Sequence, residues 1–515
     1  MKYIRLLLII ITLSLSSCEN YFDLERPPQN PWTTIDEFER VPIGLYASVY
    51  SGHHWNIPYV NYAIFKNSMG DDVNWVSDPS WGYWRNTKEH NTWSKRNFNL
   101  LYRTISSANN ALEFIADNNG DPFPGASDED KRNNFDRIVG EIYFMRGMAY
   151  YYLQTFYGHA YSPSGNNNTP DLPLRLTYPK SLEEAKSPEI GTTQQIFDLI
   201  LSDFKKATEL LPDKYLEGVH HQSYSVRANK FAAKAMLMKV HFSRGEYNDA
   251  LSLCNEIIDQ NGGEYDLSED PIEAFNKVGL ERGRETIFYI PFYDITLATP
   301  HHFSVINHTY ENNLMCSWTE NRMSNTLINK LNWLKEPNSI LFNIEARRDK
   351  RFQQLMAVRY PTDKASGNMD VDSRVEIQDV TTVWPFKYYK SAELFFTNVP
   401  LIRLGEIQLT RSILRFKNGD LTGSASDLNK VRQRSWDEAV GGTFVEISTG
   451  DLTEDLIHTE RMVEMFGEPD RVDYLRSLKM NIPPGDREGF ATEPYDSESF
   501  VWAIPTEESI YNENL

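Results

Sequence analysis

The sequence is poor in cysteine, in basic residues and in long hydrophobic runs. Its only cysteines among 515 residues are Cys18, Cys254 and Cys316, and none belongs to a CxxC pair, which excludes a disulfide framework. Beyond residues 6–15, no segment approaches the 18 apolar residues of a membrane-spanning helix. Lysine and arginine number 52 against 72 acids, a net charge of −20. A chain this acidic is not expected to bind the phosphate backbone of nucleic acid.

Catalytic motifs are also missing. The sequence contains no GxSxG, no HExxH, no P-loop and no GxGxxG after a predicted strand. Ser202 and Lys205 match SxxK, but no SDN or KTG follows, and we interpret the match as coincidence. The three histidine pairs are expected at the surface or in packing, because adjacent side chains point apart on regular elements; they are His53-His54, His220-His221 and His301-His302. The sequence thus predicts no enzyme, no cofactor and no metal site.

One stretch resembles a calcium-binding loop. Asn368–Asp379 places oxygen ligands at positions 1, 3, 5, 9 and 12 of such a loop. It lacks the glycine at position 6, ends in Asp rather than Glu, and follows no helical pattern. A solvated acidic loop is the simpler prediction, and the sequence alone leaves calcium there open.

The N-terminus carries a processing signal. Two basic residues precede the short apolar run Leu6–Leu15, and the sequence LSSC follows, ending at Cys18. This pattern resembles a bacterial lipobox, in which the cysteine is acylated and becomes the first residue; an ordinary secretory signal is the alternative. We predict a signal peptide at 1–17, an acylated, proline-containing tether at 18–31 and one domain at 32–515. An acidic protein would be held at the membrane by its acyl chains, at roughly 0.8 kcal/mol per buried CH₂.

Helical periodicity dominates the remainder and predicts a mainly α-helical fold. Two stretches read as helix–turn–helix units, Val226–Ile258 with a break at Gly245, and Pro400–Arg434 with a break at 418–420. Both lengths are near the 34 residues of a tetratricopeptide repeat. In the first unit, small residues such as Ala232 and Ala235 favour close helix contact.

A third unit is predicted to be split by a long polar loop, pairing Gly140–Tyr157 with Thr192–Leu211. Long insertions rich in turn residues separate the helices, and one includes the strand-like run Glu285–Tyr293. Loops of this length are usually functional. The predicted insertions lie near 66–97, 159–191, 260–325, 360–400 and 436–453.

The stretch GDDVNWVSDPSWGYWRNT, Gly70–Thr87, concentrates aromatic residues in an unusual way. Trp75, Trp81, Tyr83 and Trp84 are spaced by 6, 2 and 1 residues, which fits neither a helix nor a strand. Flat apolar rings suit the C–H face of a pyranose, at about 0.5–1.5 kcal/mol per aromatic contact. Neighbouring polar side chains supply hydrogen bonds, namely Asn74, Arg85 and Asn86. The stretch therefore predicts a sugar-binding loop; the alternative is that the rings fasten the loop to the helices.

Several motifs together resemble the SusD/RagB family of lipoproteins, in family order along the chain. They are EIYFMRGMAYYYLQTFYG (Glu141–Gly158), PLIRLGEIQLTRSILRFKNGD (Pro400–Asp420), DLNKVRQRS (Asp427–Ser435), ERMVEMFGEPDRVDYLRSL (Glu460–Leu478) and IPTEESIYNENL (Ile504–Leu515). The chain departs from the family in two places. The usual acidic-Gly-x-Arg segment reads GEPDR at 467–471, and Gly405 stands where alanine is common.

The resemblance implies four tetratricopeptide-like helix pairs that carry an irregular, loop-rich ligand-binding face. It also implies a lipid-anchored protein at the cell surface, on the outer membrane, which captures oligosaccharide or polysaccharide and delivers it to a SusC-like TonB-dependent transporter. In the family the glycan site is commonly an aromatic arc in the loop corresponding to Gly70–Thr87. Here Trp81, Tyr83 and Asn86 keep that spacing, and Trp318 is the residue expected to complete the arc. Tyr293 and Tyr310 are weaker candidates.

Two other functions stay open at this point. One is capture of a peptide or another nutrient, or a purely structural role as the lid of the transporter. The other is glycoside hydrolysis, which requires two suitably spaced carboxylates; no motif supports it. The predicted site consists of Trp75, Trp81, Tyr83, Trp84, Asn86 and Trp318, with lipidation at Cys18.

Overall fold

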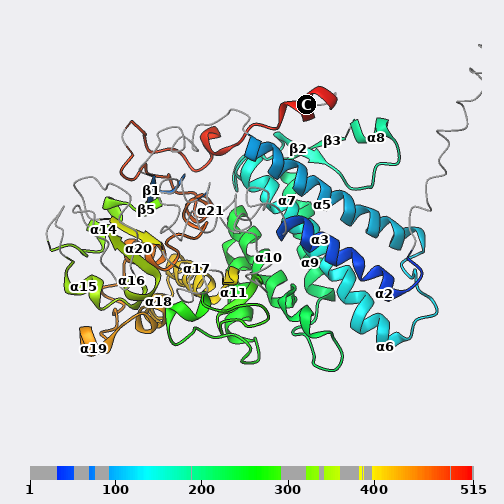
Figure 1. The fold of residues 1–515 in the computed structure, drawn as a ribbon. Coiled ribbons are helices and arrows are strands. Elements are labelled where there is room, and N and C mark those ends of the chain that lie inside the picture. Colours follow the sequence, from blue (N-terminus) through cyan, green and yellow to red (C-terminus); the bar gives the residue numbers. More distant parts are fainter. Residues whose placement is uncertain are drawn as a thin grey trace, which may run out of the picture.

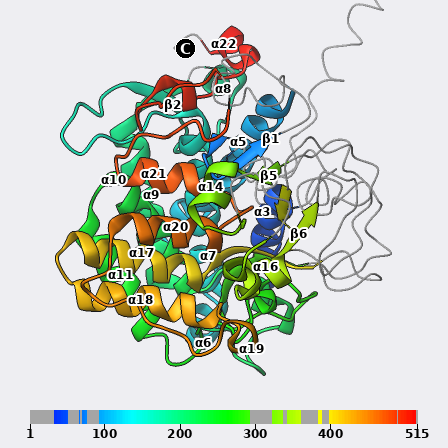
Figure 2. The same ribbon diagram turned by 90° about the vertical axis from the view of Figure 1, so that its left-hand side faces the viewer.

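The computed structural model describes residues 32–50, 66, 69–75, 92–186, 188–291, 321–335, 342–359, 382–385, 387, 397–487 and 489–512. Helices dominate these residues, and their strands form antiparallel pairs. Figures 1 and 2 show the long helices packed side by side, with the C-terminal segment running along one edge. The mainly α-helical fold expected from the sequence is confirmed.

Within the described ranges, four helix pairs form the scaffold, as the family resemblance implied. They are α3 (Arg40–Tyr50) with α5 (Thr92–Asp117), α7 (Asp136–Tyr157) with α9 (Thr193–Leu210), α10 (Lys230–Arg244) with α11 (Tyr247–Asp259), and α17 (Leu404–Lys417) with α18 (Leu421–Arg434). Successive pairs also pack on each other through α5 and α7, α9 and α10, and α11 and α17. Both predicted helix–turn–helix units are therefore confirmed, and so is the split third unit.

Shorter helices connect and cover these pairs. They are α2 (Ile35–Phe38), α6 (Asp128–Asp130), α8 (Leu182–Lys186), α14 (Asn325–Lys330), α15 (Ile344–Arg347), α16 (Lys350–Leu355), α19 (Glu438–Gly441), α20 (Glu454–Glu464), α21 (Arg471–Ser477) and α22 (Thr506–Tyr511), with a π-helical turn at Lys131–Phe135 and 3₁₀ turns at Gln222–Val226, Pro271–Ala274 and Glu498–Phe500. Within the described parts of the chain, no helix combines the length and the apolar character needed to cross a membrane.

The α10–α11 pair shows how the sequence specifies a repeat. The Asn229 side chain accepts a hydrogen bond from the Ala232 N–H at 3.0 Å and caps the start of α10. Gly245, at φ 78°, ends that helix in the left-handed conformation. Ala232 and Ala235 are fully buried, as expected for residues that let two helices approach closely, and Cys254 of α11 is a buried core residue.

Enlarging Ala235 is expected to destabilise this pair. Ala235→Leu inserts methyl groups into a filled contact, which typically costs about 1–3 kcal/mol, so the melting temperature should fall. The matched control is Ala439→Leu on the exposed surface of α19, which should leave melting unchanged. Thermal unfolding monitored by circular dichroism checks both variants, and equal melting of Ala235→Leu and wild type would contradict the packing.

The described residues outside the helix pairs include four short antiparallel strand pairs. These are β1 (Val73–Trp75) with β5 (Asn321–Met323), β2 (Pro170–Leu174) with β3 (Glu189–Thr192), β4 (Thr286–Ile290) with β8 (Val399–Arg403), and β6 (Met356–Arg359) with β7 (Thr382–Pro385). The strand predicted within 285–293 is confirmed as the fully buried β4. Figure 1 shows β1, β5 and α14–α16 at the end of the molecule opposite α2 and α6.

The prediction of a polar loop at 159–191 is only partly right, because this insertion contains β2, β3 and α8. Asp171 of β2 is buried and accepts hydrogen bonds from Gln154 at 2.9 Å and Thr193 at 2.7 Å. A third partner is His159, whose ring contacts the same carboxylate. The polar composition predicted a loop, but the segment is ordered because the Asp171 carboxylate is buried and hydrogen-bonded rather than exposed to solvent.

A buried ion cluster joins α18 of the scaffold to α16, α20 and β8. Glu464, at the end of α20, is 2% exposed and pairs with Arg403 of β8, Arg434 of α18 and Arg351 of α16.

The surroundings of Gly405 explain one departure from the family pattern. A Cβ there would lie 2.5 Å from Arg403 Nη1 and 2.9 Å from Glu464 Oε1, so glycine leaves room for the ion pair beside α17.

Candidate functional site

Of the six predicted sugar-binding residues, only Trp75 belongs to the described part of the chain, through its main chain as the last residue of β1. The other five, Trp81, Tyr83, Trp84, Asn86 and Trp318, lie outside the described residues, as does the lipidation site Cys18. The structure corrects one detail, since Trp75 ends a strand rather than lying in a loop. The partner of that strand is about 250 residues away in the sequence, and a three-residue strand carries too little pattern of its own.

The β1–β5 pair brings two predicted insertions to one point. Val73 lies opposite Met323 and Trp75 opposite Asn321, and the Ser324 N–H donates to the Asp72 carbonyl at 2.8 Å. The chain therefore leaves β1 toward residues 76–91 directly beside the place where it enters β5 from residues 292–320. Trp318 is three positions before β5 in the sequence.

A separate small hydrophobic core packs against this strand pair. Val73 and Met323 are buried there together with apolar residues of α14, of the segment after it and of α20. Members of this cluster include Leu327, Ile328, Trp333, Phe342, Met462, Val463 and Phe466. The base of the predicted loop is thus fixed to packed side chains.

The acidic residues before β1 are buried, although the sequence indicated only a turn. Asp71 accepts two hydrogen bonds from Arg471 of α21, at 2.6 Å from Nε and 3.1 Å from Nη2. Asp72 is 2% exposed, and its Oδ1 has no partner among the described residues. Burial, together with the neighbouring Asp71 charge, raises the pKa of Asp72 to about 7.

Arg487 completes the base from the C-terminal segment. Its guanidinium donates to the carbonyl oxygens of Gly70 and of Val73, the latter at 2.9 Å. Burial lowers the pKa of Arg487 to about 10, still well above neutral, so the group stays charged. These anchors were missed by sequence reasoning, because partners separated by 400 or more positions leave no local signal.

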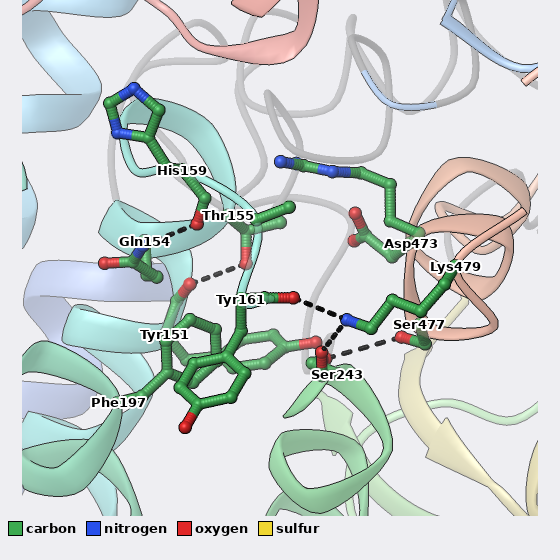
Figure 3. A pocket seen from close by; sticks show the side chains of 12 residues that line it. Tyr151, Gln154, Thr155, His159, Tyr161, Phe197, Ser243, Asp473, Ser477 and Lys479 are labelled. Carbon is green, nitrogen blue, oxygen red and sulfur yellow. Dashed lines mark hydrogen bonds between the residues drawn. The ribbon is translucent and has the colours of Figure 1, made fainter. Parts of the chain in front are cut away.

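A second candidate is the pocket between the end of α7, the last turn of α10 and α21 (Figure 3). The Lys479 ammonium donates to the carbonyl oxygens of Tyr161 and Ser243, both at 2.7 Å. Its burial lowers the pKa of Lys479 to about 7. On the other walls, Asp473 is paired with Lys66 and His159 with Asp171. The charged groups Lys479, Asp473 and His159 are thus committed to protein partners, so we do not place the ligand site there.

The histidine pair within the described residues contacts other protein groups. His220 contacts the main chain of Leu216 and Asn133, whereas His221 contacts Ser223. His220 is half-buried and His221 exposed, in agreement with the surface or packing role expected for this pair; the other two pairs lie outside the described residues, as does the calcium-like stretch Asn368–Asp379. Ser202 and Lys205 of the SxxK match are both exposed on α9, which is no environment for an activated nucleophile.

One cluster of metal-ligand type was not predicted. His241, Glu246 and Asp249 place ligand atoms within 4.8 Å of one another at the α10–α11 turn. However, His241 Nδ1 already contacts Glu246 at 2.6 Å, and Arg244 donates to the other oxygen of that carboxylate at 2.7 Å. The guanidinium opposes a cation at this position, and the cluster is explained as a helix-end ion pair.

Two family models together match most of the chain. Residues 21–242 match a model described as "Starch-binding associating with outer membrane", and residues 285–514 match the model of the SusD family. The chain belongs to the SusD family. Comparison with curated proteins finds no significant match.

Solved SusD structures share this fold. A SusD superfamily protein from Bacteroides thetaiotaomicron aligns with a TM-score of 0.71 at 20% identity, covering 94% of this chain and 99% of the other. A SusD-like carbohydrate-binding protein from Bacteroides vulgatus gives 0.70 at 15% identity, with 94% and 98% covered. Another SusD-like carbohydrate-binding protein, from Bacteroides fragilis, gives 0.66 at 17% identity, with 94% and 99% covered. At these identities the likeness establishes the fold.

The segment GEPDR at 467–471 forms buried ion pairs with residues of several other elements. Glu468 accepts two hydrogen bonds from Arg403, at 2.9 and 2.8 Å. Asp470 forms a bidentate pair with Arg461 at 2.8 and 2.6 Å, and the next residue, Arg471, holds Asp71. The altered GEPDR sequence thus links the helical scaffold to the base of the predicted loop.

Proposed function

We propose that this SusD protein captures oligosaccharide or polysaccharide at the cell surface, using the aromatic stretch Gly70–Thr87 together with Trp318. The observation that carries the proposal is the β1–β5 pair, which joins the chain positions flanking both aromatic segments on one packed base. Family membership supports it, since one matching model is described as starch-binding and two structural neighbours are carbohydrate-binding proteins. Stacking on flat rings gives weak contacts that add along an extended glycan.

Delivery of the captured glycan to a SusC-like TonB-dependent transporter completes the proposed role. A lipid anchor at Cys18 would hold the protein on the outer membrane beside such a transporter. The family model, whose description includes association with the outer membrane, supports this location. No catalytic step is proposed, because no catalytic motif occurs in the sequence.

A screen of binding and cleavage tests the function. Protein from Glu19 onward is applied to a glycan array and, in parallel, to a peptide library, and each glycan bound is checked by calorimetry and by analysis of reducing ends. We expect glycan binding with background release of reducing ends. Binding of peptides alone would favour the alternative of peptide capture, no binding would favour a structural lid, and steady product release would indicate a hydrolase.

Removing the acylated cysteine is expected to release the protein from the outer membrane. Cys18→Ala leaves no sulfur for acylation, and a charge of −20 provides no attraction to anionic lipid. Cell fractionation followed by immunoblotting should find the variant outside the membrane fraction, whereas Cys316→Ala should fractionate like wild type. Recovery of Cys18→Ala in the membrane at the wild-type level would contradict the lipoprotein assignment.

A further inference from the structure

The base of the aromatic stretch is held by residues from the C-terminal quarter of the chain. Three of them, Arg471, Asp486 and Arg487, make side-chain hydrogen bonds to the segments that flank β1 and β5. We refer to these three residues as the C-terminal clamp. We propose that the clamp positions the glycan-binding loop, by fixing where the chain leaves β1 and enters β5; this inference rests on the proposed function.

Arg471 fixes the start of β1. Its bidentate bond to Asp71 is almost fully enclosed, with side chains 10% and 8% exposed. A planar guanidinium facing a carboxylate with two bonds defines orientation as well as distance. Two positions further along α21, Asp473 holds Lys66 at 2.9 Å, and that ammonium also donates to the Thr155 carbonyl at 3.0 Å. Helix α21 therefore binds the chain at Lys66 and at Asp71, which both precede the aromatic residues.

Arg487 supports β1 on the edge away from β5. In the part of the chain that the structure describes, β5 is the one strand paired with β1, so carbonyl groups outside that pairing need other donors. The Arg487 guanidinium donates to the carbonyls of Gly70 and Val73. The turn that precedes Arg487 packs closely against the main chain of Asp71. A Cβ on Gly485, whose φ is +64°, would lie 2.9 Å from the Asp71 carbonyl oxygen, so only glycine fits this approach.

Asp486 fixes the other strand through the helix that follows it. Its carboxylate accepts hydrogen bonds from the N–H of Asn325 and, at 3.0 Å, from that of Thr326 at the start of α14. The Thr326 hydroxyl adds a bond at 2.8 Å. Neighbouring residues of one turn thus hold the segments on both sides of the strand pair. The positions at which the chain leaves β1 and enters β5 therefore depend on this turn and on α21.

Such fixing matters for a site built from weak contacts. Ordering a loop on binding would consume a large part of the gain from a few stacked rings. A base that is already ordered removes that cost for the residues nearest the strands. The clamp is therefore expected to affect affinity without touching the ligand.

The test compares two buried Arg–Asp pairs of the same geometry. Asp71→Asn with Arg471→Gln removes the clamp pair without leaving an unpaired charge. The control is Asp203→Asn with Arg146→Gln, which removes the bidentate pair, at 2.8 and 2.7 Å, between α7 and α9. Each protein is examined by amide hydrogen exchange, by thermal melting and by calorimetry with the glycan selected in the screen. Arg471→Lys, which retains the charge but not the bidentate geometry, is the conservative variant.

We expect the clamp variant to exchange the amides of residues 70–75 and 321–324 at least tenfold faster, and to bind glycan at least fivefold more weakly. The control should leave both quantities at wild-type values, even if it melts earlier, and Arg471→Lys should fall between wild type and the clamp variant. Wild-type exchange and affinity in the clamp variant would overturn the proposal. Equal losses of affinity in both double variants would also overturn it, because the Asp71–Arg471 pair would then affect binding only through general stability.

The two proposals fail in different ways. If wild-type protein binds no glycan, the proposed function fails, and with it the role of the clamp in binding. The exchange measurement then still decides whether the clamp holds the β1–β5 pair. If the clamp double variant does not fold, Arg471→Lys carries the test, and unchanged exchange and affinity in that variant would overturn the inference.

Discussion

Replacing Glu464 with alanine is expected to lower the free energy of unfolding by about 3–5 kcal/mol, the usual cost of breaking a buried ion pair. Its carboxylate lies among three guanidiniums, of Arg351, Arg403 and Arg434, all at most 9% exposed. Without the carboxylate, three buried cations lose a shared partner. Chemical denaturation followed by circular dichroism measures the loss.

An exposed acid provides the control for this prediction. Glu209 pairs with Lys206 on the surface of α9, and Glu209→Gln should leave the unfolding curve unchanged. If Glu464→Ala unfolded at the same denaturant concentration as wild type, the cluster would be solvated and the account of the scaffold wrong.

The same cluster predicts a loss of stability in acid. Burial alone would raise the pKa of Glu464, but the surrounding guanidiniums hold this pKa well below its ordinary value of 4.5. A lowered folded-state pKa contributes stability above the unfolded-state value, and this contribution is lost as the pH falls through the folded-state pKa. Stability attributable to Glu464 should therefore be complete above about pH 5 and decline below it.

Trp81→Ala and Tyr83→Ala are each expected to weaken glycan binding at least tenfold, about 1.4 kcal/mol, with nearly unchanged melting. If these rings stack on sugar, they are exposed in the free protein, and their loss spares the core. If instead they fasten the loop to the helices, each change should destabilise the protein by about 3–5 kcal/mol. Calorimetry and thermal melting on the same samples distinguish the two cases.

Two further variants sharpen this comparison. Asn86→Ala should also weaken binding, through a lost polar contact rather than lost stacking. Trp436→Ala removes a tryptophan that is held elsewhere, by Arg348 and by the Gly442 carbonyl, and should leave affinity at the wild-type value. Unfolding of the Trp81 and Tyr83 variants with full affinity in the folded fraction would contradict the stacking site.

The helical scaffold could be predicted from the sequence because its signals are local. Small and large residues recur at helical spacing, and the cap residues Asn229 and Gly245 flank α10 directly. All of these signals lie within a few helical turns of one another in the sequence. The pairing of α7 with α9 also followed, since helices interrupted by one insertion keep their apolar faces.

The base of the site could not be predicted in the same way. Asp71 and Asp72 resemble turn residues in isolation, and their burial follows from Arg471 and Arg487, some 400 positions away. A three-residue strand such as β1 has no period of its own, so its pairing with β5 depends on the tertiary packing around Val73 and Met323. Long-range charge pairs and short strands are thus the part of this fold that one sequence does not reveal.

The central claim is that sugar lies against the aromatic stretch Gly70–Thr87. The most direct measurement is a crystal structure of the protein from Glu19 onward, soaked with the oligosaccharide that binds best in the screen. The account predicts a pyranose ring stacked on Trp81 and Tyr83, with Asn86 bonded to a hydroxyl and Trp318 at the edge of the ligand. Oligosaccharide bound in the pocket beside Lys479, or anywhere that leaves these rings uncovered, would contradict it.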